Sequence, residues 1–113
     1  MARISASEFA RLVQDDCHQS SLVVSYEVQI LDDTVVKIRV VLTLDAFIAI
    51  FYNADSGKCS YALIEHGVRV FGADNAFIGW HIHPFNAPEE HIPASEVSFA
   101  DFLSAIENNA QQN

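Results

Sequence analysis

The chain has 113 residues, of which 50% are apolar and 19% are charged; six basic side chains stand against fifteen acidic ones, giving a formal net charge of −9. This size and composition predict one globular domain with its own core and exclude a largely disordered chain. The acidic excess disfavours autonomous binding to RNA or DNA, because affinity for a phosphate backbone depends on Lys and Arg.

No segment has the pattern of a membrane span or a secretory signal. The most apolar run, LTLDAFIAIFYN, is interrupted by Asp45, and the N-terminal stretch MARISASEFARLVQDD has no continuous apolar core. A span needs about 20 consecutive apolar residues. Cys17 and Cys59 are far apart and have no metal-type C-x-x-C spacing. We therefore expect a cytoplasmic protein without membrane association, with two reduced thiols.

The first predicted element is a helix over about residues 5–17. Ser5 followed three residues later by Glu8 forms a capping-box pattern. Apolar residues at Phe9, Leu12 and Val13 then give the i, i+3, i+4 spacing of a helix with one buried face.

The next two segments alternate apolar and polar residues, as strands do. In LVVSYEVQI (22–30) the even positions are apolar, and TVVKIRVVLTL (34–44) repeats the pattern. Asp32 and Asp33 between them are typical turn residues. The pair predicts a β-hairpin.

Three further strands are predicted before the histidine-rich region. AFIAIFYN (46–53) is apolar on both faces, which predicts a central strand covered on each side. KCSYALIEH (58–66) and VRVFG (68–72) follow, after the turn ADSG. The connections are too short for parallel crossovers, so an antiparallel meander is expected.

The last predicted element is a helix in SEVSFADFLSAIEN (95–108), where Ser98 and Asp101 have capping spacing. Its apolar stripe consists of Phe99, Phe102, Leu103 and Ile106. A polar tail from about residue 108 is expected to fray. The predicted fold is a single α+β domain over residues 1–113: an antiparallel β-meander sheet of five to six strands with N- and C-terminal helices on its apolar face.

The stretch FIGWHIHPFNAPEEHIP (77–93) contains three of the five histidines, the only Trp and all three Pro. If GWHIHP is a strand, His81 and His83 project from one face, while Trp80 and Ile82 point into the core. Pro84 would end that strand, since proline has no N–H to donate to a ladder.

A loop of seven residues separates His83 from His91 and can return His91 to the other two. Three interpretations of this cluster are open. It can be a zinc or other transition-metal site, since imidazole is a common metal ligand. It can be an acid–base site, because histidine both takes and gives protons near neutral pH. It can also be structural, with the imidazoles bonded to loop carbonyls and carboxylates.

Two further residues are candidates for the same site. Asp74 precedes the histidine strand and can orient an imidazole through its second nitrogen, or can simply belong to an Asp-Asn turn. Tyr61 lies near a turn and is a candidate auxiliary residue, although a core position is the default for a strand tyrosine. Nothing in the sequence near Cys59 would lower its pKa, which disfavours a nucleophilic Cys–His pair.

The order of these motifs resembles the TumE-type family of toxin components from prokaryotic toxin–antitoxin pairs. The resemblance covers about the second half of the chain, from YNADSGKC to FADFLSAIE. In that family a Y-x-Y-type hairpin precedes a DN turn, an H-x-H-P stretch, a loop with another histidine and a closing helix. The matching positions are Tyr52, Tyr61, Asp74, Asn75, His81, His83, Pro84 and His91.

The resemblance implies a small cytoplasmic protein that pairs with an antitoxin protein and acts on RNA. It would then be a metal-independent endoribonuclease, without a cofactor, in which His81 and His83 supply the acid and the base. Two alternatives stay open: a non-catalytic interaction module and a three-histidine metal-binding protein holding zinc or a similar divalent ion. A homodimer is expected, because the apolar positions of the first two strands exceed what one short helix can cover.

Overall fold

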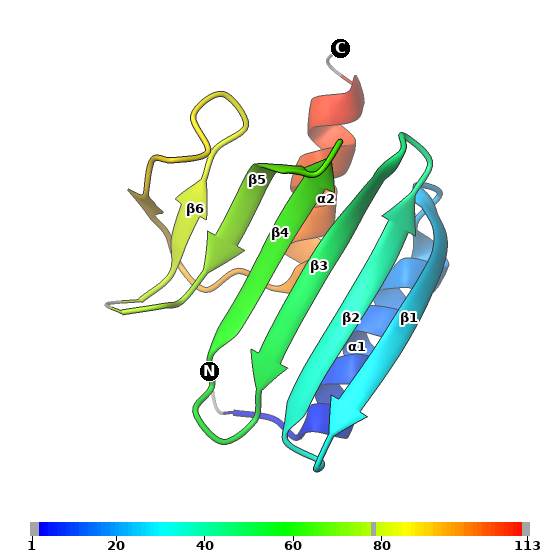
Figure 1. Cartoon of the computed structure of the whole chain (residues 1–113), viewed down its shortest axis with the longest axis vertical. Coiled ribbons are helices and arrows are strands. Elements are labelled where there is room, and N and C mark those ends of the chain that lie inside the picture. Colours follow the sequence, from blue (N-terminus) through cyan, green and yellow to red (C-terminus); the bar gives the residue numbers. More distant parts are fainter. Residues whose placement is uncertain (1–2, 78, 112–113) are drawn as a thin grey trace.

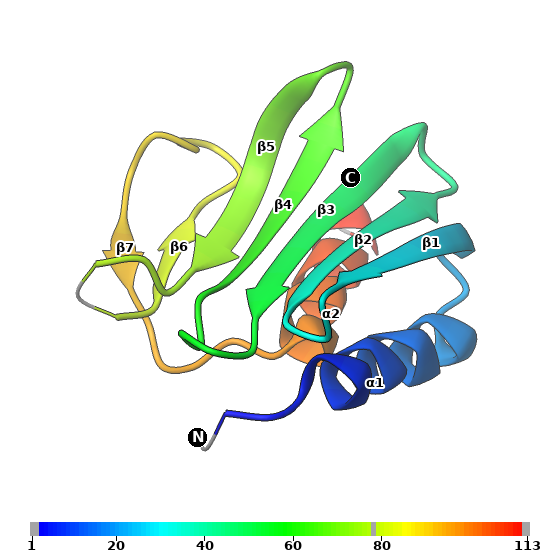
Figure 2. The same ribbon diagram turned by 60° about the horizontal axis from the view of Figure 1, so that its bottom comes forward.

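The computed structural model describes residues 3–77 and 79–111, and its seven strands form one antiparallel sheet in sequence order, β1 to β7. Two helices pack on one face of this sheet (Figures 1 and 2). The strands are β1 (Val23–Leu31), β2 (Val35–Leu42), β3 (Ala46–Asn53), β4 (Cys59–Glu65), β5 (Val68–Asp74), β6 (His81–His83) and β7 (Ile92–Pro93). The predicted α+β meander is confirmed, with the two-residue β7 as an addition to the expected strands.

Both helices begin at the predicted capping residues. Helix α1 (Ala6–Gln19) starts after Ser5, whose hydroxyl accepts the backbone N–H of Glu8 at 3.1 Å. Helix α2 (Phe99–Gln111) starts with a reciprocal capping box, in which Ser98 and Asp101 each accept the other's backbone N–H at 3.1 Å. The residues from 108 to 111, predicted to fray, continue α2.

The core lies between the helices and one face of the sheet. From the sheet it takes the even-numbered residues of β2 and β3, and from α2 it takes residues such as Phe102, which is 1% exposed. The strongly buried sheet residues include Val36, Ile38, Val40, Ile48 and Ile50. Among residues 3–77 and 79–111 no helix is long and apolar enough to span a membrane.

The opposite face of the sheet, called here the open face, is not covered by either helix (Figure 2). The prediction that β3 is covered on both sides was therefore wrong. On the open face Phe47 and Phe51 are half-buried and Ala49 is exposed. Long polar side chains shield this apolar surface instead: the guanidinium of Arg39 lies 3.8 Å from the centre of the Phe47 ring.

Strand β1 departs from the predicted alternation at its start. A register shift between Val23 and Ser25 breaks the pairing with β2, and Val24 is 63% exposed instead of facing the core. A bulge inserts one residue and so changes the face on which the neighbouring side chains lie. From Ser25 to Leu31 the register with β2 is regular.

Candidate functional site

Strands β5 and β6 place three polar side chains on the open face. The register pairs Asp74 with His81 and Gly72 with His83. Because alternate residues of a strand share a face, His81 and His83 project together beside Asp74 of the neighbouring strand. Strand β6 ends at His83, directly before Pro84, and Trp80 and Ile82 pack against the core on the other side, all as predicted.

One carboxylate bridges the two imidazoles. Asp74 Oδ1 lies 3.0 Å from His81 Nε2, and Asp74 Oδ2 lies 3.0 Å from His83 Nε2. The Asp74 carboxylate also accepts the backbone N–H of Ala76 at 3.0 Å. The neighbouring Asn75 fixes the adjacent turn, since its side-chain oxygen accepts the N–H of Cys59 at 2.8 Å. Asp74 thus contacts the imidazoles, as an orienting residue would, and the Asp-Asn pair also holds the turn.

The other nitrogen of each ring faces a backbone carbonyl. His81 Nδ1 lies 3.2 Å from the oxygen of Gly79, and His83 Nδ1 lies 3.0 Å from the oxygen of Glu90. A carbonyl oxygen only accepts hydrogen bonds, so each Nδ1 carries the proton in these contacts. The loop glutamate Glu90 therefore serves this site through its backbone.

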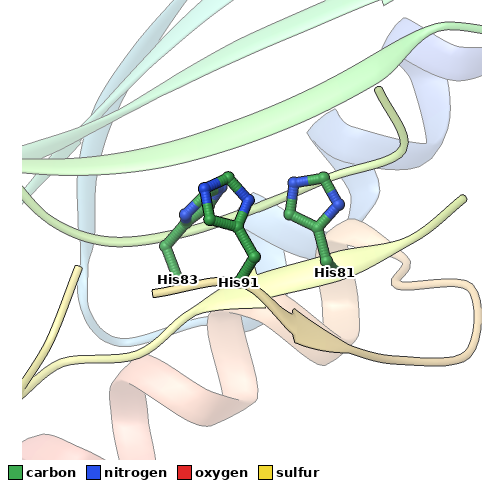
Figure 3. Close-up of side chains that lie close together, drawn as sticks. All are labelled: His81, His83 and His91. Atoms are coloured by element: carbon green, nitrogen blue, oxygen red, sulfur yellow. The ribbon is translucent and has the colours of Figure 1, made fainter. Parts of the chain in front are cut away.

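The loop after β6 returns His91 to the same place. Two tight turns fold it back, with the N–H of Ala87 bonded to Pro84 and the N–H of Glu90 bonded to Ala87. The three imidazoles point to one side of β6 (Figure 3). One nitrogen from each of His81, His83 and His91 lies within 4.8 Å of the other two. The predicted convergence of the three histidines is present in the structure.

The cluster is enclosed on its protein side and open at His91. The side chains of His81 and His83 are 13% and 4% exposed, whereas His91 is exposed. Gly72 permits this enclosure: a Cβ there would lie 3.4 Å from His83 Cδ2 and 3.3 Å from the backbone oxygen of Tyr61. Arg69 ties the loop down by donating to the carbonyl of Pro88 at 2.9 Å.

The surroundings of Asp74 favour its ionised form. Partial burial raises the pKa of this carboxyl, but the hydrogen bonds from His83 and Ala76 and the positive charge of the imidazoles outweigh burial and hold the pKa below its ordinary value. The rings of His81 and His83 therefore each have an acceptor opposite both nitrogens: a carbonyl oxygen at Nδ1 and the Asp74 carboxylate at Nε2. All four contacts are favourable when each ring carries two protons, or when a cation takes the place of the two Nε2 protons.

Two other candidates are not part of the cluster. Tyr61 lies on the helix-covered face, 4% exposed, with its ring 5.3 Å from that of Phe102. Burial raises its pKa well above the ordinary value, so it is a neutral core residue. Burial likewise raises the pKa of Cys59 to about 11, which removes the thiolate that a nucleophile needs.

The sequence did not reveal the basic character of the open face. Lys37 and Arg39 of β2 line a groove of about 540 Å³ on this face, together with Glu27 of β1 and with Phe51 and Ala49 of β3. Arg69 of β5 joins the histidine end of the same face through its contact with the loop. Strand alternation alone puts Lys37 and Arg39 on the same face of the sheet. The face of Arg69 depends on a register shift between β4 and β5, which only the structure reveals.

Comparison with known proteins adds no family assignment, because no protein-family model, curated protein or solved structure matches the chain. The similarity to TumE-type toxins stays a prediction from the sequence.

Proposed function

We propose that this protein binds one divalent transition-metal ion of the zinc type through His81, His83 and His91. The observation that carries the proposal is the convergence of three imidazole nitrogens, two from β6 and one from the loop after it, within 4.8 Å of one another. Nitrogens held about 2.0–2.1 Å from one tetrahedral ion are about 3.4 Å apart. Binding would therefore draw the three nitrogens together, and His91, exposed on the loop after β6, is the ring best placed to move.

The contacts of the two strand histidines support this proposal. A histidine that ligates a metal with one nitrogen usually donates the other N–H to a carbonyl or a carboxylate. Gly79 and Glu90 offer such carbonyls to the Nδ1 atoms. Both Nε2 atoms then face the same region, where the Asp74 carboxylate supplies the negative charge that a cation requires.

A zinc-type ion supplies Lewis acidity and lowers the pKa of a bound water, which is the basis of metal-assisted hydrolysis. The residues of the chain have three roles in that chemistry. The enclosed His81 and His83 would hold the ion, the exposed His91 would leave the site reachable from solvent, and the Asp74 carboxylate would supply negative charge beside the ion. We therefore favour a small hydrolase over a purely structural metal site.

Metal binding to the purified, chelator-treated protein tests this proposal. Isothermal titration with zinc, together with elemental analysis after dialysis, should give one ion per chain for the wild type. His81→Ala/His83→Ala should abolish that ion, whereas His66→Asn, in an exposed turn away from the site, should retain it. Absence of stoichiometric zinc in the wild type, or retention of it by the double variant, would refute the proposal.

A second candidate is RNA cleavage by histidine acid–base chemistry, as the TumE-type resemblance implies. The observation in its favour is the position of Lys37, Arg39 and Arg69 on the open face that carries the histidines, although the chain as a whole is acidic. Cationic side chains beside the aromatic Phe51 are suited to a single strand with phosphates and bases. His91, which is exposed, is the imidazole that a substrate can reach most directly.

Cleavage of a labelled single-stranded RNA separates the two candidates. Activity that survives chelator and disappears in His91→Ala favours acid–base chemistry, whereas activity restored only by zinc favours the metal proposal. Lys37→Glu/Arg39→Glu should weaken RNA binding, with Lys58→Glu as a control outside the groove. An inactive wild type under both conditions removes the RNA candidate and leaves the metal-binding proposal to its own test.

A further inference from the structure

The two edges of the sheet differ in a way that predicts an interface. Strand β7 forms one edge and contains only Ile92 and Pro93, so it is short and ends in a residue that cannot donate a ladder hydrogen bond. Strand β1 forms the other edge, with nine residues and no Pro, Gly or Lys. Short strands, proline and lysine are usual means of blocking an edge, and β1 has none of them; a β-bulge is another, and the bulge of β1 lies at its start, before Ser25.

The β1 edge is also unusually apolar for a surface strand. Ile30 is 38% exposed and Leu31 is 40% exposed, in addition to Val24 at the bulge. The strand carries a single charge, that of Glu27, on a chain whose net charge is −9. An edge with unpaired backbone groups, exposed aliphatic side chains and little charge is suited to pairing with another strand.

We propose that β1 pairs antiparallel with β1 of a second copy of this chain, about a two-fold axis at Val28. The pairing would join the two seven-stranded sheets into one continuous sheet. Since the axis is perpendicular to the sheet, both open faces would lie on the same side, and the two grooves lined by Glu27, Lys37 and Arg39 would meet along the new junction.

The side chains of β1 determine this register. Directly opposite residues of an antiparallel pair share a face. The two-fold axis therefore has to set one residue of β1 opposite the same residue of the second copy. Any other position of the axis would set residues from opposite faces against each other. An axis at Glu27 would set two carboxylates against each other, which is destabilising. An axis at Val28 sets Glu27 opposite Gln29, whose amide can donate to the carboxylate.

The rest of the paired segment fits the same axis. Tyr26 comes opposite Ile30, an aromatic and β-branched pair of the kind that stabilises neighbouring strands. Ser25 comes opposite Leu31, so the paired segment begins just after the bulge and ends at the last residue of β1. Regular backbone is thus available over the whole segment in both copies. This self-complementarity is the reason to identify the occupant as a second copy of the chain.

Sedimentation velocity or light scattering on the full chain tests the proposal. The wild type should have twice the monomer mass of 12.5 kDa at a concentration of about 100 µM, corresponding to a dissociation constant at or below about 10 µM. Gln29→Glu places a new carboxylate opposite Glu27 twice per dimer and should weaken association at least about tenfold.

A charge-preserving swap makes the test specific for the register. Glu27→Gln/Gln29→Glu has the wild-type charge and again sets an amide opposite a carboxylate, so it should restore the dimer. Asn86→Asp adds the same single charge on an exposed loop and should dimerise like the wild type. Circular dichroism confirms that each variant is folded. A monomeric wild type, a Gln29→Glu variant that associates normally, or a swap that fails to restore association overturns the proposal.

Discussion

At the scale of single residues, Asp74 connects the two enclosed histidines, because its two oxygens each meet one Nε2 atom. Asp74→Asn keeps the shape but replaces one oxygen by a donor that faces a ring nitrogen. We expect zinc affinity to fall about 10–100-fold, as for the loss of other groups that support metal ligands. Without metal, urea unfolding should show a loss of about 1.5–3 kcal/mol in the free energy of unfolding, the range for hydrogen bonds to charged groups.

Zinc titration and urea melts of Asp74→Asn, with chelator present in the melts, measure these two effects. Asp55→Asn is a suitable control, since Asp55 is exposed in the β3–β4 turn. Wild-type affinity together with wild-type stability in Asp74→Asn would show that the shared carboxylate is unimportant.

The two cysteines are predicted to be unreactive in the folded protein. Burial, assisted by the charge of Asp16, raises the pKa of Cys17 to about 11, and burial raises that of Cys59 to about 11 as well. A shift of two pKa units lowers the thiolate fraction about 100-fold near pH 8. Iodoacetamide labelling followed by mass spectrometry should therefore be about 100-fold slower for native than for urea-unfolded protein. Equal labelling rates would contradict the burial of both thiols.

The same shifts predict lower stability in alkali. A thiol whose pKa is raised in the folded state stabilises the fold fully below its unfolded pKa, and this contribution is lost as the pH rises through the folded value. The window runs from about 9 to about 11. The free energy of unfolding should fall by about 1–3 kcal/mol across it. Urea melts at pH 8 and pH 11 check this. The free energy of unfolding of the Cys17→Ala/Cys59→Ala variant should fall less between these two pH values than that of the wild type.

At the scale of elements, the start of α2 depends on a local motif that the sequence alone identifies. Ser98→Ala removes the hydroxyl that accepts the N–H of Asp101, and should destabilise the protein by about 1 kcal/mol. Ser104→Ala, on the exposed face of the same helix, should be neutral or slightly stabilising, because alanine favours helix. Thermal unfolding of both variants measures the difference, and equal effects would argue against capping at Ser98.

The strands were predicted less completely than the helices. Alternation identified β1 to β5 and set His81 and His83 on one face, because the period of two is a local property of a strand. It did not locate the bulge at Val24 or the two-residue β7, since both depend on the neighbouring strand and not on their own residues. β7 in particular contains Pro93, a residue that a strand tolerates at the edge of a sheet but that does not by itself predict a strand.

At the scale of the whole molecule, charge is distributed unevenly between the two faces. The open face carries Lys37, Arg39 and Arg69 together with Glu27 and Asp74, whereas α1, on the other side of the sheet, carries Glu8, Asp15 and Asp16 together with Arg11. A net charge of −9 disfavoured RNA in the sequence because composition averages over these faces. Folding separates them, so that the electrostatic environment of the site differs from that of the chain as a whole.

This separation predicts opposite salt effects on the two proposed interactions. Dimerisation brings together two chains of charge −9 through an edge with one charge each, so added salt should strengthen it by screening repulsion. RNA binding to the basic groove should weaken with salt, since it releases counterions. Sedimentation and RNA-binding titrations at about 0.05 M and about 0.5 M NaCl measure the direction of the salt effect on dimerisation and on RNA binding. A dimer that dissociates with added salt would argue for ion pairs across the interface instead.

Local patterns in the sequence determined the two helices and their caps, the meander of alternating strands and the shared face of His81 and His83. Each follows from interactions between residues close in the chain, where periodicity and capping act. Only the tertiary structure decided that Asp74 bridges two imidazoles, that His91 returns to them, that Tyr61 lies on the opposite face and that three cations gather on the open face. These depend on strand register and on the path of a loop, which join residues that the sequence keeps apart.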